Sequence, residues 1–378
     1  MMKLPPFKLV TRSNDWLNCL DRLRAEPRLA IDLEANSMFA YRESVCLIQI
    51  STPAQDYIVD PTTDLDLSGL GQLVADSAVE KIFHAAEYDL ILLKRQYGWE
   101  LNNLFDTMWA ARILGYQRFG LASLLEQFFD VKLNKRYQKS NWCQRPLEAA
   151  QLAYAQHDTH FLFKLRDRLW REIVEADCEE ESLEAFAEQT QITLNDNSFN
   201  PDGFWSMNGA RDMTRQQLAV LKELHIYRDQ EARKRDQPLF KIFSGHTMLE
   251  LARQSPSNMD ELVCVHGMTR GQVRRYGRSL LQVISKGKTA SPPARPRRKH
   301  KRKPEAVIAR YDKLRQWRKE RAKARGVESD VILSRGVLWE IAQSNPQDIE
   351  DLEQLELLGS WRCKKYGDEI LRVLKNTS

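Results

Sequence analysis

The feature that most constrains the fold is an internal repeat in the second half of this chain of 378 residues. When the sequence is shifted by 90 positions, identical residues recur in one register without a gap. Chance matches do not keep one register over about 60 residues. The repeat therefore predicts two copies of one small helical domain, at residues 209–286 and 305–378. The matching residues of the first copy are Leu224, Arg228, Ala232, Arg235, Ile242, Glu250, Ala252, Pro256, Leu262, Tyr276, Gly277 and Leu281.

Between the two copies, residues 287–304 are rich in proline and in basic side chains. Pro292, Pro293 and Pro296 precede a run of cationic residues that extends from Arg297 to Lys303. Proline interrupts regular structure and like charges repel one another, so we expect an extended linker. Two interpretations stay open, because such a linker either is a solvated tether or binds phosphate groups.

The first 200 residues alternate short β-like segments with helical ones. The predicted strands are Leu29–Glu34, Val45–Ile50, Tyr57–Val59 and Lys81–Phe83. The predicted helices are Glu87–Tyr97, Leu121–Phe129 and Leu147–Val174. This alternation indicates an α/β domain with a mixed sheet flanked by helices.

Charge is distributed unevenly along the chain. Residues 1–200 contain 21 Lys and Arg and 30 Asp and Glu, a net charge of −9. The remaining 178 residues contain 36 and 22, a net charge of +14. A basic half joined to an acidic half favours binding of a polyanion such as nucleic acid, although a merely solvated charged surface is the alternative.

The cysteines and the N-terminus give no sign of export or of a metal site. The six cysteines form no C-x-x-C pair, so we expect neither a zinc site nor a disulfide framework, and we expect a reducing cytosol. The N-terminus has no apolar signal segment, and no apolar stretch approaches about 18 residues. We find no Walker A or G-x-G-x-x-G motif, so we expect no nucleotide cofactor.

Two carboxylates stand out in the first predicted strand. In the order Ile31, Asp32, Leu33, Glu34, apolar and acidic residues alternate. Because side chains alternate between the faces of a strand, the two acids share one face while the apolar residues enter the core. Two neighbouring carboxylates are expensive to bury without positive charge between them, and a divalent cation supplies it.

Two further acids and a phenol extend this pattern. The segment from His84 to Asp89 joins a strand to a helix and places Asp89 in the first helical turn, where an acid also compensates the helix dipole. Tyr154 and Asp158 are four residues apart, so they share one helix face. A surface Tyr–Asp pair is the alternative, but the neighbouring helix positions are apolar.

The motifs D-x-E, H-A-A-E-Y-D and Y-A-x-x-D together resemble those of the DEDD exonuclease superfamily, in the tyrosine-bearing branch that includes the ribonuclease D family. The segments 45–50, 106–107 and 142–147 agree with the motifs that link these acids in that family. The repeats resemble the helicase-and-RNase-D C-terminal (HRDC) domain. This sequence departs from the family at Leu33 and Ala35, where Thr and Phe are usual, which puts substrate stacking at Ala35 in question.

The resemblance implies an RNase H-like fold and a metal-dependent 3′→5′ exoribonuclease that releases nucleoside 5′-monophosphates. The implied partner is RNA with a free 3′ end, such as a tRNA precursor, and the implied location is the cytoplasm. We expect a monomer. Tyr154 would orient the attacking water. The implied ligands of two Mg²⁺ or Mn²⁺ ions are Asp32, Glu34, Asp89 and Asp158.

Two rival functions stay open on the sequence. One is a DNA 3′→5′ exonuclease of the kind linked to repair helicases, and the other is a nucleic-acid-binding HRDC protein without catalysis. We expect Tyr276 and Tyr366 to pack in the repeat cores rather than stack on bases. The basic residues predicted to bind nucleic acid are Arg233, Lys234, Arg235, Arg274, Arg275, Arg297, Arg298, Lys299, Arg318, Lys364 and Lys365.

Four polar residues near the acids have structural interpretations. His84 and His157 are expected to be structural histidines rather than metal ligands. Asp106 is expected to cap the helix that follows it. Gln49 is expected to bond backbone groups near the site.

Overall fold

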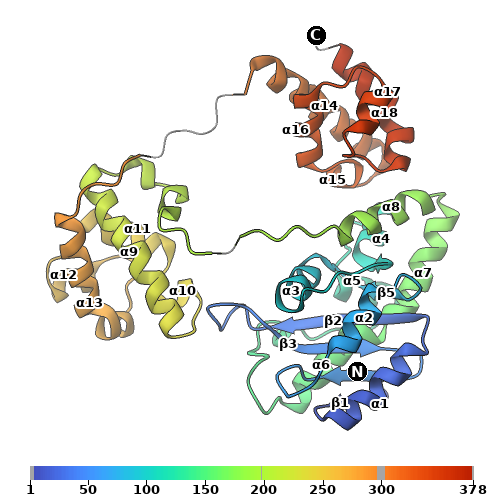
Figure 1. Cartoon of the computed structure of the whole chain (residues 1–378), viewed down its shortest axis with the longest axis horizontal. Coiled ribbons are helices and arrows are strands. Elements are labelled where there is room, and N and C mark those ends of the chain that lie inside the picture. The colour runs from blue at the N-terminus through green and yellow to red at the C-terminus, as the bar shows by residue number, and fades with distance from the viewer. Residues whose placement is uncertain (1–3, 197, 296–302, 377–378) are drawn as a thin grey trace. The chain divides into compact units, whose positions relative to one another are not determined.

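The computed structural model describes residues 4–196, 198–295 and 303–376 (Figure 1). Its contacts divide the chain into two compact units. The first comprises residues 1–34, 45–194 and 300–378, and therefore combines the α/β domain with the second helical repeat. The second comprises residues 35–44 and 195–299, and therefore combines the first repeat with the loop that follows Glu34. No helix in the described ranges is long and apolar enough to cross a membrane.

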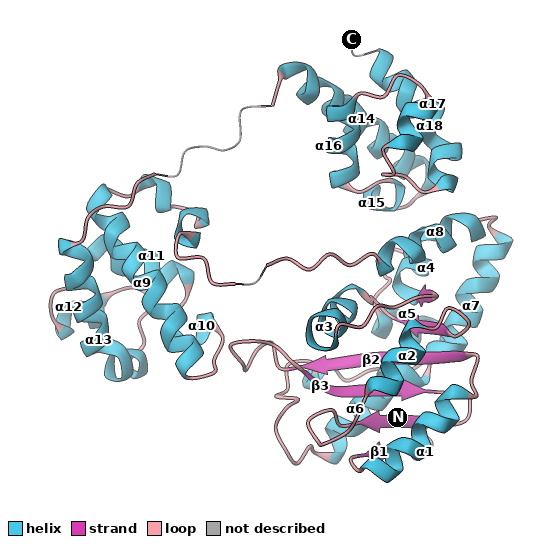
Figure 2. Ribbon diagram, viewed as in Figure 1, coloured by secondary structure: helices cyan, strands magenta, loops and turns pink. Residues whose placement is uncertain are grey.

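The α/β domain is built on a mixed sheet of six strands in the order β1-β4-β3-β2-β5-β6 (Figure 2). β3 pairs antiparallel with β4, whereas β1 pairs parallel with β4, and β5 pairs parallel with both β2 and β6. The predicted fold class is confirmed. The four predicted strands are present, whereas the three-residue strands β1 and β6 are too short to show an alternating pattern. The strands are β1 Lys8–Val10, β2 Arg28–Ala35, β3 Val45–Ser51, β4 Asp56–Val59, β5 Glu80–Phe83 and β6 Leu104–Asp106.

Eight helices accompany this sheet among the described residues. The helices predicted at 87–97 and 121–129 are confirmed, but the single helix predicted at 147–174 is wrong. It is divided at Phe161, whose backbone stays in the α region (φ −93°, ψ −4°). No proline or glycine stands at the break. The helices are α1 Ser13–Arg24, α2 Ser68–Ala75, α3 Glu87–Tyr97, α4 Thr107–Ile113, α5 Leu121–Phe129, α6 Ala149–His160, α7 Leu162–Glu175 and α8 Glu179–Thr190.

Different helices cover different strands of the sheet. α6 packs on β3 and β4, α7 on β5, and α8 on β6. The core between the sheet and helices α4, α5 and α7 includes Ala30, Ile82 and Phe105, all at most 2% exposed. Every residue of β3 is buried. This packing fixes β2 in the middle of the sheet, where its acidic face is held rigidly.

The predicted repeat is confirmed by five helices in each copy. Shifting α10, α11 and α12 by 90 residues reproduces the bounds of α15, α16 and α17. Tyr276 and Tyr366 are 2% and 3% exposed, so both belong to the cores, as predicted. The first copy consists of α9 Arg215–Lys234, α10 Leu239–Ile242, α11 Gly245–Gln254, α12 Met259–Cys264 and α13 Arg270–Thr289. The second copy consists of α14 Glu305–Arg325, α15 Ser329–Ile332, α16 Arg335–Ser344, α17 Ile349–Gln354 and α18 Ser360–Lys375.

The last helix of each copy is capped differently. In the first copy, Thr269 and Gln272 form a capping box at the start of α13. The matching positions in the second copy are Gly359 and Arg362, which cannot form such a box. There the Glu184 carboxylate of α8 accepts hydrogen bonds from Trp361 N at 2.7 Å and Arg362 N at 3.3 Å. The second repeat therefore takes its helix cap from the α/β domain.

Gly359 makes room for this cap. A Cβ atom at position 359 would lie 2.0 Å from the Cδ atom of Glu184. Arg362, which replaces the glutamine of the first copy, is 3% exposed and bonds Glu184 at 3.0 Å and Glu188 at 2.6 Å. Arg325 of α14 binds both carboxylate oxygens of Glu181, at 2.6 and 2.7 Å. These three acids of α8 thus each have an arginine partner in the second repeat.

The loop of residues 35–44 belongs to the same unit as the first repeat. The Tyr41 hydroxyl donates to Asp229 at 2.6 Å, and the Tyr41 N–H donates to Asp236 at 3.0 Å. Arg233 pairs with Asp229 at 3.5 Å and lies over the Tyr41 ring. Asp229 is 5% exposed, so these contacts give a buried charge its partners.

One disulfide contradicts the expectation drawn from the cysteines. Cys46 of β3 is bonded to Cys143, with a sequence separation of 97 residues. No spacing pattern can reveal a pair so far apart, because only the folded chain brings the two thiols together. Cys19, Cys178, Cys264 and Cys363 are free.

Candidate active site

Strand β2 presents the first two acids as its alternation predicts. Ile31 and Leu33 are 1% and 8% exposed and enter the core. Asp32 and Glu34 are half-buried and lie on the other face of the strand, which borders a cavity. Their positions follow from the period of two, because burying the apolar residues leaves the acids no other face.

Helix α6 presents Tyr154 and Asp158 to the same cavity. The helix is anchored by the buried carboxylate of Asp56 in β4. That carboxylate accepts a hydrogen bond from Gln156 at 2.6 Å and is 2.8 Å from His160 Nδ1. These hydrogen bonds, made by the side of α6 that faces β4, help fix its rotation and therefore the direction of Tyr154 and Asp158.

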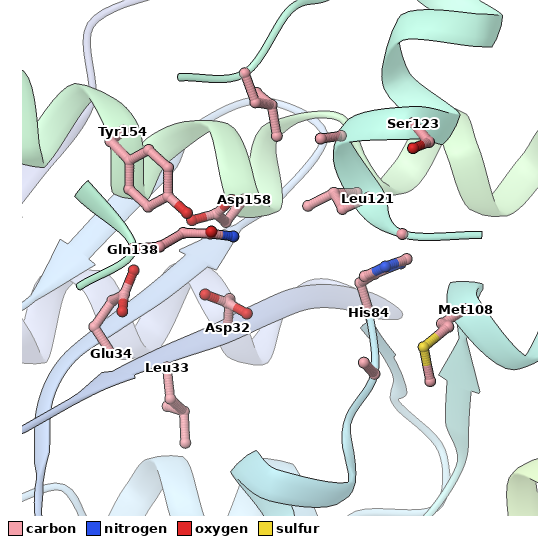
Figure 3. A pocket seen from close by; sticks show the side chains of 14 residues that line it. Asp32, Leu33, Glu34, His84, Met108, Leu121, Ser123, Gln138, Tyr154 and Asp158 are labelled. Carbon is pink, nitrogen blue, oxygen red and sulfur yellow. The ribbon is translucent and has the colours of Figure 1, made fainter. Parts of the chain in front are cut away.

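Three of the four predicted metal ligands converge closely. Asp32, Glu34 and Asp158 each place a carboxylate oxygen within 4.8 Å of the other two (Figure 3). Asp89 is 6% exposed in the first turn of α3, and it lies outside this closest group. Burial raises the pKa of Asp89 well above its usual value, and the charges of Asp32, Asp106 and Asp158 raise it further. Asp89 therefore shares the electrostatic environment of the cluster.

The acids of the cluster are held in unfavourable electrostatic surroundings. Burial raises the pKa of Asp32 to about 7. Burial, followed by the charges of Asp32, Asp158 and Asp89, raises the pKa of Glu34 to about 10. Within the described ranges, none of the four acids has a lysine, arginine or histidine ion-pair partner. Only oxygen donors meet here, and such a set suits a hard divalent cation that would neutralise them.

Tyr154 lies beside the acids of the cluster. Burial, and then the charges of Asp158, Glu34 and Asp32, raise its pKa well above the usual value, so the phenol stays protonated at neutral pH. Gln138 lines the cavity near Tyr154 (Figure 3). The rings of Trp142 and Tyr137 lie 5.9 and 6.1 Å from the Tyr154 ring and support it.

Asp106 organises the turn between β5 and α3. It accepts hydrogen bonds from Ala85 N at 3.0 Å and Ala86 N at 2.8 Å, where Ala85 has a left-handed backbone (φ 63°). It also caps α4 by accepting from Met108 N and Trp109 N. The predicted cap is confirmed, and the same carboxylate additionally holds the turn that leads to Asp89.

The two histidines near the acids make structural hydrogen bonds. His84 Nδ1 lies 2.9 Å from Thr107 Oγ1, and burial lowers the pKa of His84 to about 4. His157 Nδ1 bonds the Ala153 carbonyl of its own helix. The expectation for Gln49 is wrong, because neither polar atom of its buried side chain has a hydrogen-bond partner among the described residues.

The cavity at the cluster has a volume of about 560 Å³. Its wall includes Gln138, Ser123 and Met108, which the sequence did not identify (Figure 3). These residues belong to loops and helix starts without a chemical motif, so no sequence signal could have found them. The full lining is Asp32, Leu33, Glu34, His84, Ala85, Met108, Gly120, Leu121, Ala122, Ser123, Leu133, Gln138, Tyr154 and Asp158.

The predicted nucleic-acid contacts fall into three groups. The exposed group, on matching positions of α13 and α18 and at the end of α9, is Arg274, Arg275, Lys364, Lys365 and Lys234. The group engaged within its own repeat is Arg233, Arg235 and Arg318, whose partners are Asp229, Glu231 and the Leu333 carbonyl. The third group, outside the described residues, is Arg297, Arg298 and Lys299.

Comparison with known proteins assigns both parts of the chain. The 3′-5′ exonuclease family model matches residues 7–174, and the HRDC domain model matches residues 217–284 and 308–374. A protein named Ribonuclease D from Acidiphilium cryptum is 30% identical over 365 residues, which cover 93% of this chain and 89% of that protein.

Two solved structures share the architecture. The catalytic core of RRP6 from Trypanosoma brucei is 27% identical with a TM-score of 0.68, and the match covers 76% of this chain and 81% of that one. The structure of Escherichia coli RNase D is 21% identical with a TM-score of 0.67, covering 98% and 99%, and it supports the fold.

Proposed function

This chain belongs to the ribonuclease D family and is a 3′→5′ exoribonuclease, and we propose that four carboxylates at its cavity hold two divalent cations, Mg²⁺ or Mn²⁺, on which the activity depends. The ligands are Asp32, Glu34, Asp89 and Asp158. The observation that carries this proposal is the convergence of acidic oxygens without a cationic side chain among the described residues. Such a cluster is stable and fully charged only when a cation occupies it.

The chemistry divides between the cations and the protein. When bound, the cations supply a nucleophilic water at neutral pH and stabilise negative charge on the phosphate and on the leaving 3′ oxygen. Tyr154 borders the cavity beside the acids, and we assign its hydroxyl to positioning the attacking water by a hydrogen bond. The cavity accepts the 3′-terminal nucleotide, which leaves as a nucleoside 5′-monophosphate.

The substrates in this proposal are tRNA precursors or other structured RNAs with a free 3′ end. The positive charge of the second half supports a polyanionic partner. The exposed pairs Arg274–Arg275 and Lys364–Lys365 offer phosphate contacts at matching places on the two repeats. We place this activity in the cytoplasm and assign it to a monomer.

The test is cleavage of a 5′-labelled, 3′-extended tRNA by the full-length protein, with Mg²⁺ or with EDTA. We expect stepwise shortening from the 3′ end with Mg²⁺ and none with EDTA, as resolved on a sequencing gel. Matched single-stranded DNA is the comparison substrate. Internal cleavage of the RNA, or shortening that EDTA does not stop, would refute the proposal.

A further inference from the structure

His84 borders the cavity on the side away from Glu34 and Tyr154. Figure 3 shows Glu34, Asp32 and Tyr154 together at one side of the pocket, and His84 with Met108 at the other. His84 is half-buried and is one of the residues that line the cavity. His84 does not belong to the group of potential metal ligands that converge within 4.8 Å, so its ring is available for a different ligand.

The hydrogen bonds of Thr107 determine the tautomer of His84. A threonine hydroxyl has one hydrogen, and here Thr107 Oγ1 donates it to the Phe83 carbonyl at 3.0 Å. The same oxygen lies 2.9 Å from His84 Nδ1 and can therefore only accept from it. Reversing this bond would leave the buried Phe83 carbonyl without that donor, which is unfavourable. The proton of the neutral imidazole consequently resides on Nδ1.

This tautomer gives the cavity a hydrogen-bond acceptor. With the proton on Nδ1, Nε2 carries a lone pair. Among the described residues nothing hydrogen-bonds Nε2, since the only hydrogen bond that His84 makes there is through Nδ1. The ring stays neutral at physiological pH because burial lowers its pKa to about 4. Nε2 of His84 therefore presents a hydrogen-bond acceptor to the cavity, which a donor group of the ligand can satisfy.

The backbone of a nucleic acid offers few such donors. Phosphate and ester oxygens only accept, whereas the 2′-hydroxyl of ribose can donate and is absent from DNA. A terminal 3′-hydroxyl donates equally in RNA and DNA, and amino groups of bases would produce a base preference instead. The 2′-hydroxyl is thus the donor that distinguishes the two polymers whatever their sequence.

We propose that His84 selects ribonucleotides by accepting a hydrogen bond at Nε2 from the 2′-hydroxyl of the nucleotide in the cavity, with Thr107 as the positioning residue that fixes the tautomer. This inference rests on the proposed function, because it assigns a specificity role within the same site. It supplies what the motif spacing lacks, a reason for the site to prefer RNA over DNA.

The test uses three 5′-labelled oligonucleotides of one sequence: all-ribose, 2′-deoxy at the 3′-terminal nucleotide, and 2′-deoxy at the penultimate nucleotide. For the wild-type protein with Mg²⁺, we expect one deoxy substitution to lower kcat/KM about tenfold, the value of one hydrogen bond. His84→Phe keeps an aromatic ring and removes the acceptor, so the ratio should fall to about one. Thr107→Val releases the tautomer and should give an intermediate ratio, which a merely structural role would not produce.

The outcomes separate this inference from the proposed function. If the wild-type protein shortens none of the three substrates, the proposed function fails. If it shortens all of them and His84→Phe retains the full wild-type ratio, the selection by His84 is wrong. The same three substrates are therefore also made with a different 3′-terminal base. A ratio that changes with that base instead of the sugar would assign the acceptor to a base amino group and would also overturn the proposal. Thermal unfolding of each variant verifies folding, and Thr107→Val decides the matter if His84→Phe does not fold.

Discussion

Two groups of acids in the same α/β domain differ in whether a cationic side chain pairs with them. Glu181 and Glu184 of α8 meet arginines of the second repeat, Arg325 and Arg362, at 2.6 and 3.0 Å. Asp32 and its neighbours at the cavity meet one another, and no cationic side chain pairs with them among the described residues. Acids that hold domains together carry their counter-charge in the sequence, whereas acids that bind a cation leave it to be supplied from solution.

Neutralising one acid of the cavity should have the largest effect on activity. Asp32→Asn removes a ligand charge, and we expect kcat/KM on 3′-extended RNA to fall by at least about a thousandfold, because the cations supply several kcal/mol of transition-state stabilisation. RNA affinity in EDTA should change little. Asp64→Asn, an exposed acid of the same domain, is the matched control. If Asp32→Asn cleaved RNA at the wild-type rate, the cavity acids would not differ in function from the acids of α8.

Breaking an acid–arginine pair should instead affect stability. Arg362 is 3% exposed, and Arg362→Met leaves Glu184 and Glu188 without their partner. We expect a loss of about 3 kcal/mol in the free energy of unfolding, measured in urea. The exposed pair of Arg315 with Asp312 is the control, and Arg315→Met should cost less than about 1 kcal/mol. Equal effects of the two variants would show that the α8 pairs are not structural.

The metal-free protein should lose stability as pH rises. Folding raises the pKa of Asp32 from 3.8 to about 7, and that of Glu34 from 4.5 to about 10. The folded state therefore keeps protons that the unfolded chain releases, and this stabilisation is present below about pH 4 and lost as pH rises through the folded values. In EDTA we expect the Tm to decrease between pH 4 and 8, and Mg²⁺ to raise it more at pH 8 than at pH 5. A Tm gain from Mg²⁺ that is independent of pH would contradict the raised pKa values of Asp32 and Glu34.

A serine at position 359 should be able to replace Glu184 as the cap of α18. Glu184→Ala removes the cap of α18, and Gly359→Ser adds a Cβ that collides with Glu184. We expect each change to destabilise the protein, the former by about 1 kcal/mol. The double variant should be more stable than either single one, since the introduced serine hydroxyl could then cap α18 as Thr269 caps α13. Simple additivity in urea unfolding would show that Glu184 is not a cap.

The smallest expected effect concerns RNA affinity. Lys364→Ala with Lys365→Ala removes two exposed charges, so RNA should bind several-fold more weakly at low salt and the slope of log K against log salt should decrease by about 1 to 2. Arg274→Ala with Arg275→Ala is the matched pair on the first repeat. Both are measured by fluorescence anisotropy in EDTA. An unchanged slope for a pair would exclude it from the RNA-binding surface.

Local patterns predicted most of the fold and the site. The alternation around Asp32, the helix at Glu87 and the shift of 90 residues each depend on neighbours in the sequence, and each corresponds to an observed element. What failed depends on distant partners. The break at Phe161 has no local signal, and the disulfide joins Cys46 to Cys143 across 97 residues. Nor could the sequence show that Asp106, expected only as a cap, also holds the turn before Asp89.

The cap that Glu184 provides also makes the second repeat depend on the α/β domain. Position 359 has no side chain, whereas its counterpart Thr269 carries a capping hydroxyl, and a Cβ atom at position 359 would collide with Glu184. Separated from the α/β domain, the second repeat would therefore lose the cap of α18, whereas the first repeat supplies the cap of α13 from its own residues.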